Sequence, residues 1–266
     1  MRKTQSWSSD AAKFAQAMPK NWFGQQIAQV IRKVVMQFAV LPIQCEVDEL
    51  KFEFYLRDNN SEKKYLFMPW RFDSAERERL VTAIPKNGVF VDIGANVGIY
   101  TLFVAKHLSN SGRVVSFEPN PSAHQRLAKN VALNEDVLSA NISLLQLGVA
   151  DTEATFELRL DSYNLGSSSL VAESGEVVQV HCKPLLEVLE SMGIEKVNGL
   201  KIDIEGAEDV ALTPFLTRAP RSMLPDIIVI ENSEHLWKTD LFGLIRSSGY
   251  SLKLKTRMNS VYQLMQ

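Results

Sequence analysis

An acid followed by a glycine-rich turn is the part of this sequence best suited to chemistry. Asp92 ends a short apolar run, residues 89–92, and an apolar helical pattern begins after the turn. The turn itself holds Gly94, Ala95, Asn96 and Gly98. Glycines let the backbone approach a ligand, and a helix start offers free amide donors. The spacing does not match the dinucleotide fingerprint, and the acid would repel a pyrophosphate. We therefore expect a ligand with a cationic or hydroxyl-bearing part.

A second acid, Glu118, is the next candidate for ligand binding. It directly follows another apolar run, residues 114–117, and it precedes Pro119. An acid at the end of the second strand of a parallel sheet accepts hydrogen bonds from the two hydroxyls of a ribose. The first turn favours an amino-acid tail over a pyrophosphate. A nucleoside with an amino-acid tail is S-adenosylmethionine, which we expect as the cofactor.

Polar residues also follow the later apolar runs. Asp203 and Glu205 come at the end of the fourth run, and Glu231 and Asn232 follow the fifth. In an open parallel sheet, ligands bind beyond the carboxyl ends of the strands. Core packing gives no reason for polar groups after successive strands. We therefore expect these side chains to gather at one sheet edge and to form the active site.

The elements that would position these residues alternate along the chain. We predict strands over residues 89–92, 114–117, 142–149, 199–204 and 226–230. We predict helices over residues 98–108, 122–134, 185–192 and 236–247, and another that ends at Leu216. This alternation indicates a parallel sheet with right-handed crossovers. Residues 250–254 and 261–264 are joined by a short turn, so they would close the sheet as an antiparallel hairpin.

Two segments stand apart from this alternation. Residues 1–84 form an N-terminal arm in front of a main domain of residues 85–266. Residues 153–183 are expected to form an inserted hairpin, and its loop, residues 164–169, is a candidate lid or substrate edge. In the arm we expect a hairpin whose strands are residues 50–56 and 65–67. The polar residues 58–64 would form its turn, followed by a helix over residues 73–84.

An apolar stripe runs through residues 22–38 of the arm, with side chains mostly three and four apart. Pro42 would stop the helix that carries it. We expect this stripe to pack on the main core or on a second copy in a homodimer. Contact with a membrane surface is the alternative, because Lys20, Arg32 and Lys33 lie nearby.

Composition limits the class of protein. The chain has 266 residues, 45% of them hydrophobic and 23% charged, with a net charge of −2. There is no long Lys/Arg run, so we do not expect nucleic acid as an obligatory partner. Cys45 and Cys182 have no metal or disulfide spacing. No apolar run reaches the ~18 residues that cross a bilayer, and the N-terminus is a poor signal peptide. We expect a soluble cytoplasmic protein.

Three motifs occur in order: DIGANVGIYT at residues 92–101, FEP at 117–119 and KIDIEGAE at 201–208. Together they resemble FkbM-type S-adenosylmethionine-dependent methyltransferases, from about residue 85 to the C-terminus. The resemblance implies an α/β fold with a Rossmann-like seven-stranded methyltransferase sheet and an antiparallel last strand, here with the helical and hairpin arm added. It also implies O-methylation of a small molecule, at a hydroxyl on a sugar or natural-product scaffold.

The resemblance further implies roles for the matched positions. The methionine part of the cofactor would be held by Asp92, Gly94, Asn96 and Gly98. The adenine would be bordered by Asn120 and by the backbone near Gly148 and Val149. Glu118 would bind the ribose hydroxyls. Other positions expected to contact the cofactor are Ala95, Thr101, Pro119 and Asp203. Asp203 and Glu205 would lie near the transferred methyl group.

A hydroxyl nucleophile is weak at neutral pH and benefits from a general base. The candidates are Glu205, Asp203 and His235, and we favour Glu205 because it follows the fourth strand. Asp203, Glu231 and Asn232 also offer three oxygen ligands from adjacent strands, the kind that Mg²⁺ accepts. A divalent metal that holds a diol is therefore an open alternative to substrate binding by these acids.

Two other functions stay open at this point. One is a non-catalytic module that binds S-adenosylmethionine without turnover. The other is an NAD-dependent oxidoreductase, which would bind NADH rather than S-adenosylmethionine. The sequence does not identify the methyl acceptor.

Overall fold

The computed structural model describes residues 2–160 and 176–265, and its centre is a seven-stranded sheet of order β11-β12-β10-β9-β3-β4-β5. Its parallel strands are β3 (Val89–Ile93), β4 (Arg113–Phe117), β5 (Asn141–Leu145), β9 (Gly199–Ile202) and β10 (Ile227–Glu231). β12 (Asn259–Leu264) runs antiparallel to β10 and to β11 (Tyr250–Lys255). The predicted α/β class and the antiparallel last strand are both confirmed.

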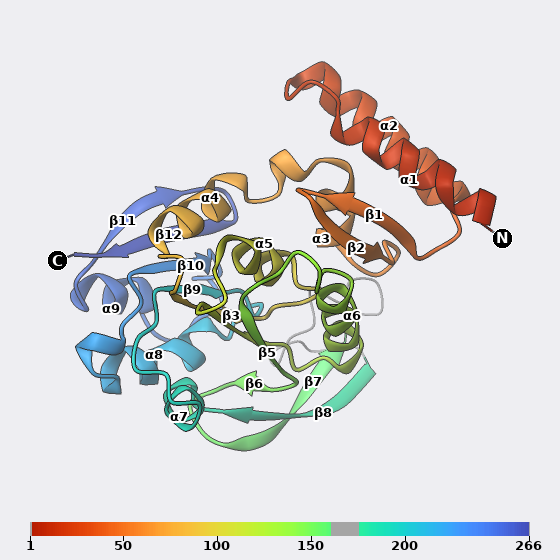
Figure 1. The fold of residues 1–266 in the computed structure, drawn as a ribbon. Helices are drawn as coiled ribbons and strands as arrows, with labels where there is room; N and C mark the ends of the chain where they lie inside the picture. The colour runs from red at the N-terminus through yellow and green to blue at the C-terminus, as the bar shows by residue number, and fades with distance from the viewer. Residues whose placement is uncertain (1, 161–175, 266) are drawn as a thin grey trace.

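Helices cover both faces of this sheet (Figure 1). One face carries α4 (Ser74–Ala83), α5 (Ile99–His107) and α6 (Pro121–Ala132). The other carries α7 (Leu185–Ser191), α8 (Glu208–Arg218) and α9 (Leu241–Ser247), with the short 3-10 turn η3 (Arg221–Met223) after α8. Successive strand residues therefore enter different cores: Phe90 packs on the α5 side and Val91 on the α8 side. Burial on both faces explains why these strands are almost continuously apolar.

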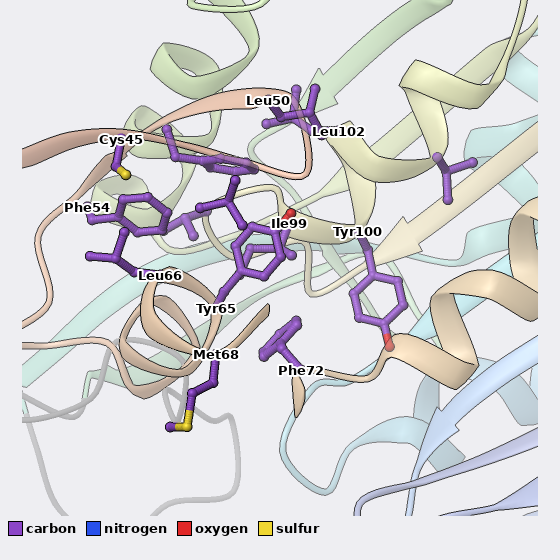
Figure 2. Packing of buried hydrophobic residues seen from close by; sticks show 14 of the residues in the cluster. Cys45, Leu50, Phe54, Tyr65, Leu66, Met68, Phe72, Ile99, Tyr100 and Leu102 are labelled. Carbon is purple, nitrogen blue, oxygen red and sulfur yellow. The ribbon is translucent and has the colours of Figure 1, made fainter. Parts of the chain in front are cut away.

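The N-terminal arm packs on the α5 side of the sheet. Before α4, its elements are α1 (Arg2–Gln16), α2 (Trp22–Phe38), β1 (Ile43–Val47), β2 (Leu50–Phe54), α3 (Asn60–Phe67) and η1 (Pro69–Arg71). Figure 2 shows aromatic rings of the arm beside α5. The ring centroids of Tyr65 and Phe72 are 5.6 Å apart, and those of Phe72 and Tyr100 are 6.4 Å apart. The arm thus shares one hydrophobic core with the sheet.

The predicted hairpin of the arm was wrong in its second half. The observed hairpin joins β1 and β2, and residues 58–67 are not a turn and a strand but lead into and form α3. Asn59 caps this helix, because its Oδ1 accepts a hydrogen bond from the Glu62 amide at 3.1 Å. The three consecutive apolar residues 65–67 are buried, which gave them the pattern of a strand.

Two predicted boundaries in the main domain were also wrong. The strand over residues 142–149 ends at Leu145, and β6 (Gly148–Val149) joins a second sheet of order β6-β8-β7. In this sheet β7 (Ala154–Leu160) pairs antiparallel with β8 (Glu176–Lys183), as a strand pair in the insertion requires. The predicted lid, residues 164–169, lies outside the described residues. The helix over residues 236–247 begins only at Leu241, because Asp240 caps it through the Gly243 amide at 2.8 Å.

Candidate active site

A cavity of about 330 Å³ lies beyond the carboxyl ends of the central strands. Its wall includes most of the residues that the sequence singled out: Asp92, Gly94, Ala95, Asn96, Glu118, Pro119, Gly148, Val149, Asp203, Glu205 and Glu231. Strands β3, β4, β9 and β10 each deliver at least one acid to this wall. The cavity is therefore the place where the predicted site residues converge.

Close backbone contact builds the first turn of the site. Gly94 has a φ of +75°, and a Cβ added there would lie 2.0 Å from the carbonyl oxygen of Asp203. Only glycine fits both conditions. The amides of Gly94 and Ala95 both donate to the carbonyl oxygen of Phe117, at 3.0 and 2.9 Å. The turn after β3 is thus fixed against the ends of its two neighbouring strands.

Asp92 lies wholly buried at the end of β3, opposite Ser116 on β4 and Lys201 on β9. Its Oδ2 accepts a hydrogen bond from the Thr101 hydroxyl at 2.6 Å. Its Oδ1 accepts no hydrogen bond from any residue in the described ranges. Burial raises the pKa of this carboxyl, while Lys201 and Thr101 lower it. Thr101 thus positions Asp92 from behind and does not line the cavity.

Lys201 is a cation of the site that the sequence reading did not single out. Its Nζ donates to the Gly94 carbonyl oxygen at 2.9 Å, and it lies 3.4 Å from Asp203 Oδ2 and 3.9 Å from Asp92 Oδ1. Burial lowers the pKa of Lys201, but Asp203 and Asp92 outweigh it, so the pKa is raised overall. The ammonium group therefore stays charged and balances the two acids at the floor of the site.

Glu118 is held from both sides. Its Oε2 accepts from the Asn96 amide at 2.7 Å, and its Oε1 accepts from the Asn120 amide at 3.0 Å. Burial raises its pKa to about 7. The Asn120 side chain caps α6, because its Oδ1 accepts from the amides of Ser122 and Ala123. Asn120 positions Glu118 through its backbone amide, and it does not line the cavity. The carboxylate keeps a lone pair on each oxygen for a pair of hydroxyl donors.

Three acids gather on the other side of the cavity, at the ends of β9 and β10. Burial, together with Asp203 and Glu231, raises the pKa of Glu205 to about 8. Burial, together with Asp203, raises the pKa of Glu231 to about 7. Glu205 has a φ of +54°, which is unusual for a residue with a side chain. Glu205 therefore holds a strained position with its protonation tuned close to neutral pH.

Glu208 fixes the loop that carries Glu205. Its Oε1 accepts from the Ile204 amide at 2.8 Å. Its Oε2 accepts from the Gly206 amide at 3.1 Å and from the Trp237 indole at 2.8 Å. The carboxylate is buried and fully occupied by these donors, so it positions the loop and takes no part in ligand contact.

Two further candidates lie away from the cavity. His235 is exposed on the turn after β10. Asn232 turns toward the terminal hairpin, since its Oδ1 accepts from the Ser260 hydroxyl at 2.7 Å and its Nδ2 donates to Thr256. Within residues 2–160 and 176–265, the structure forms no cluster of three His, Cys, Asp or Glu side chains that could hold a metal ion. The Asn232 amide is thus engaged by the terminal hairpin, while Asp203 and Glu231 line the cavity, and a metal held there stays a prediction.

The N-terminal arm also contributes to the cavity wall, through Asn60, Ser61, Lys64, Phe72 and Asp73. Sequence reasoning missed these residues because it treated the arm as separate. The Asn59 amide group donates to Asn96 Oδ1 at 2.8 Å, and the Tyr100 hydroxyl donates to Asp73 at 3.1 Å. The pairing of Asn59 with Glu62 as a helix cap was the signal that could have placed α3.

These features fit S-adenosylmethionine. A cavity of this size lies within the range of small-molecule sites. Six carboxylates and two lysines line it, which suits a ligand with a sulfonium and an ammonium cation. Asp92 Oδ1 is a buried acceptor at the cavity wall with no donor among the described residues. Gly94 and its neighbours would hold the methionine part, and Glu118 would hold the ribose.

The parallel sheet, the acid-rich edge and the glycine turn define a Rossmann-like methyltransferase. A family model described as the methyltransferase FkbM domain matches residues 92–252, more than half of the chain. The chain belongs to this family, and S-adenosylmethionine is its cofactor. The family assignment removes the NAD-dependent alternative.

Curated proteins match part of this chain in sequence. Methyltransferase sdnD of Sordaria araneosa is 30% identical over 159 residues, which are 48% of this chain and 60% of that protein. The hexuronic acid methyltransferase AglP of Haloferax volcanii is 22% identical over 195 residues, 71% of this chain and 76% of that protein. The chain spans about three fifths of the length of the first two curated relatives, at 60% and 58%.

The solved structures that match this chain include a precorrin-6y C5,15-methyltransferase of Geobacter metallireducens. It has a TM-score of 0.44 and 14% identity, and the match covers 71% of this chain and 87% of that one. Another is M. jannaschii TYW2 in complex with AdoMet, with a TM-score of 0.43, 14% identity and coverage of 86% and 89%.

Proposed function

We propose that this protein transfers a methyl group from S-adenosylmethionine to a hydroxyl oxygen of a small molecule of the sugar or natural-product type. The observation that carries this proposal is Glu205, a carboxylate at the cavity wall whose pKa is raised to about 8 beside Asp203 and Glu231. A hydroxyl must lose its proton as it is methylated, and a base with a pKa near the working pH is effective in that role. The relative named as a hexuronic acid methyltransferase supports a hydroxylated acceptor.

Each group of residues has a distinct part in this mechanism. When bound, S-adenosylmethionine supplies an electrophilic methyl group on its sulfonium sulfur. Asp92 would accept a hydrogen bond from the amino group of the methionine part. Lys201 lies 3.9 Å from Asp92 Oδ1 and 3.4 Å from Asp203 Oδ2, so its charge balances both acids. Glu118 would accept hydrogen bonds from the ribose hydroxyls of the cofactor. Glu205 accepts the proton of the acceptor hydroxyl.

The arm forms part of the cavity wall. Phe72 presents an apolar ring at the wall, and Asn60, Ser61 and Lys64 present polar groups there. Positioning and exclusion of water supply most of the rate gain when the donor is already activated. We therefore assign acceptor contacts to the arm and to the acids at the ends of β9 and β10.

The test combines calorimetry with a release assay for S-adenosylhomocysteine over a panel of hydroxylated acceptors. Glu205→Gln should keep the affinity for S-adenosylmethionine and lower kcat by about 10²–10⁴-fold. The wild-type rate should rise with pH toward about 8, and the variant should lose this rise. The matched control is Glu234→Gln, an exposed acid paired with Lys255.

Full activity of Glu205→Gln would contradict the base assignment. Tight binding of S-adenosylmethionine with no release on any acceptor would favour a non-catalytic binding module instead.

A further inference from the structure

Helix α2 carries an exposed apolar stripe that the described chain leaves uncovered. Its members, with exposed fractions, are Trp22 (64%), Phe23 (71%), Ile27 (44%), Val30 (61%), Val34 (46%) and Phe38 (65%). Ala28 and Val35, on another side of the same helix, are buried against the rest of the arm. Figure 1 shows the α1–α2 hairpin at the periphery of the molecule, beyond β1 and β2. Neither the cavity nor the sheet thus accounts for this stripe.

The stripe is larger than ordinary surface scatter. Typical side-chain areas give it an apolar surface on the order of 600 Å², at the upper end of the patches that monomeric proteins expose. Phe14 of α1 is also 59% exposed, which adds an aromatic ring to the same hairpin. A patch of this size marks an interaction surface.

Charge indicates what covers it. Residues 1–42 hold six Lys and Arg residues and one acid, a net charge of +5, whereas the other 224 residues carry −7. Helix α2 itself contains Arg32 and Lys33 and no Asp or Glu. Lys33 is exposed beside the stripe, and Lys20 is exposed just before the helix. Such side chains bury their stems along an apolar surface and keep the ammonium group at a polar boundary.

A second copy of the chain fits this pattern poorly. Helices that pair along a seam of this spacing place opposite charges beside it, and two copies of α2 would bring only basic residues together. An anionic lipid surface supplies both an apolar layer for the rings and negative charge for the lysines. We propose that α2 docks on the surface of a bilayer that carries anionic headgroups. None of the helices within the described ranges is long and apolar enough to cross a bilayer, so the helix would lie in the interface.

The experiment is flotation of the full chain with two kinds of vesicle, pure phosphatidylcholine and an equal mixture of phosphatidylcholine and phosphatidylglycerol. The wild type should float with the anionic vesicles and only weakly with the neutral ones. Added salt should weaken the binding, since it screens exposed charges. Each basic residue near an anionic surface strengthens binding about fivefold. The double variant Lys20→Gln/Lys33→Gln should therefore bind the anionic vesicles roughly 25-fold more weakly.

The apolar part is tested by Phe23→Ser/Phe38→Ser, with Val137→Ser/Leu252→Ser as the matched control. The control residues are apolar, 46% and 47% exposed, and lie outside the stripe. The stripe variant should lose flotation and the control should keep it, with both showing the wild-type melting curve. All four substituted side chains face solvent, so neither variant removes core packing.

Three outcomes would overturn the proposal. The first is a wild type that does not float with anionic vesicles. The second is equal flotation with both kinds of vesicle. The third is a dimer in light scattering that Phe23→Ser/Phe38→Ser dissociates, without any vesicle binding, which would assign the stripe to a second copy of the chain.

Discussion

Replacing Lys201 by Met tests the electrostatic design of the site. Lys201 is 5% exposed, and its ammonium group contacts a backbone carbonyl and two acids. Methionine keeps the length of the side chain but removes the charge. Asp92, which is wholly buried, would then lose the cation that the described residues place beside it.

The expected loss of folding stability follows from how deeply Lys201 and its two acid partners are buried. Removing one partner of a buried ion pair costs about 3–5 kcal/mol. The Asp203 side chain is 40% exposed, so water resolvates it, and we take the lower end, about 3 kcal/mol at pH 8. Burial already raises the pKa of Asp92, and Lys201 lowers it, so the variant raises this pKa further. A raised pKa lets Asp92 take up a proton more readily as the pH falls, so the loss should be smaller at pH 5 than at pH 8.

The assay is urea denaturation at pH 5 and at pH 8 without ligand. Lys196→Met is the control, because its pair with Asp226 is exposed by 41% and 39% and should contribute at most about 1 kcal/mol. Lys201 also lowers the pKa of Glu205, so the rising limb of the pH–rate profile should move to higher pH in Lys201→Met. A free energy of unfolding for Lys201→Met within about 0.5 kcal/mol of the wild type at pH 8 would refute this reasoning. An equal loss of stability at pH 5 and pH 8 would also refute it.

Two further predictions concern the cofactor pocket. Glu118→Gln should weaken S-adenosylmethionine roughly 10- to 100-fold in calorimetry, because the ribose loses a charged acceptor, whereas the exposed Glu234→Gln should change nothing. The unliganded protein should lose stability as pH rises from about 5 to 8. Burial raises the pKa of Glu118 to about 7 and of Glu205 to about 8, so the folded state binds these protons more tightly than the unfolded chain. A melting temperature that rises over this interval would contradict these raised pKa values.

The sequence predicted the site best where residues follow strand ends. Asp92, Glu118 and Asp203 each come directly after an apolar run, and topology alone then brings them to one edge. The structure confirms the sheet and places these acids at the cavity wall. Local patterns were sufficient there because the carboxyl ends of parallel strands share one edge.

The rest depended on contacts between distant segments. Lys201 begins the motif of residues 201–208, but only its register opposite Asp92 in the sheet shows that it lies beside the acids. Asp73 and Asn60 reach the cavity because the arm packs against α5 through aromatic rings. Gly148 lies in β6 and not in the strand predicted over residues 142–149, because it pairs with Cys182 of β8. A Cβ added at Gly148 would lie 2.4 Å from Cys182 Sγ, so this pairing requires a residue without a side chain. No local period in the sequence reports such pairings.

Calorimetry of S-adenosylmethionine with Asp92→Asn tests most directly that the turn after β3 holds the methionine part. Asparagine preserves the shape and the hydrogen bond from Thr101 but removes the charged acceptor. The wild type should bind one molecule per chain, and Asp92→Asn should bind roughly 10- to 150-fold more weakly with its fold intact, from the loss of one charge-assisted hydrogen bond. An unchanged affinity in Asp92→Asn, or no binding by the wild type, would contradict the assignment of this site.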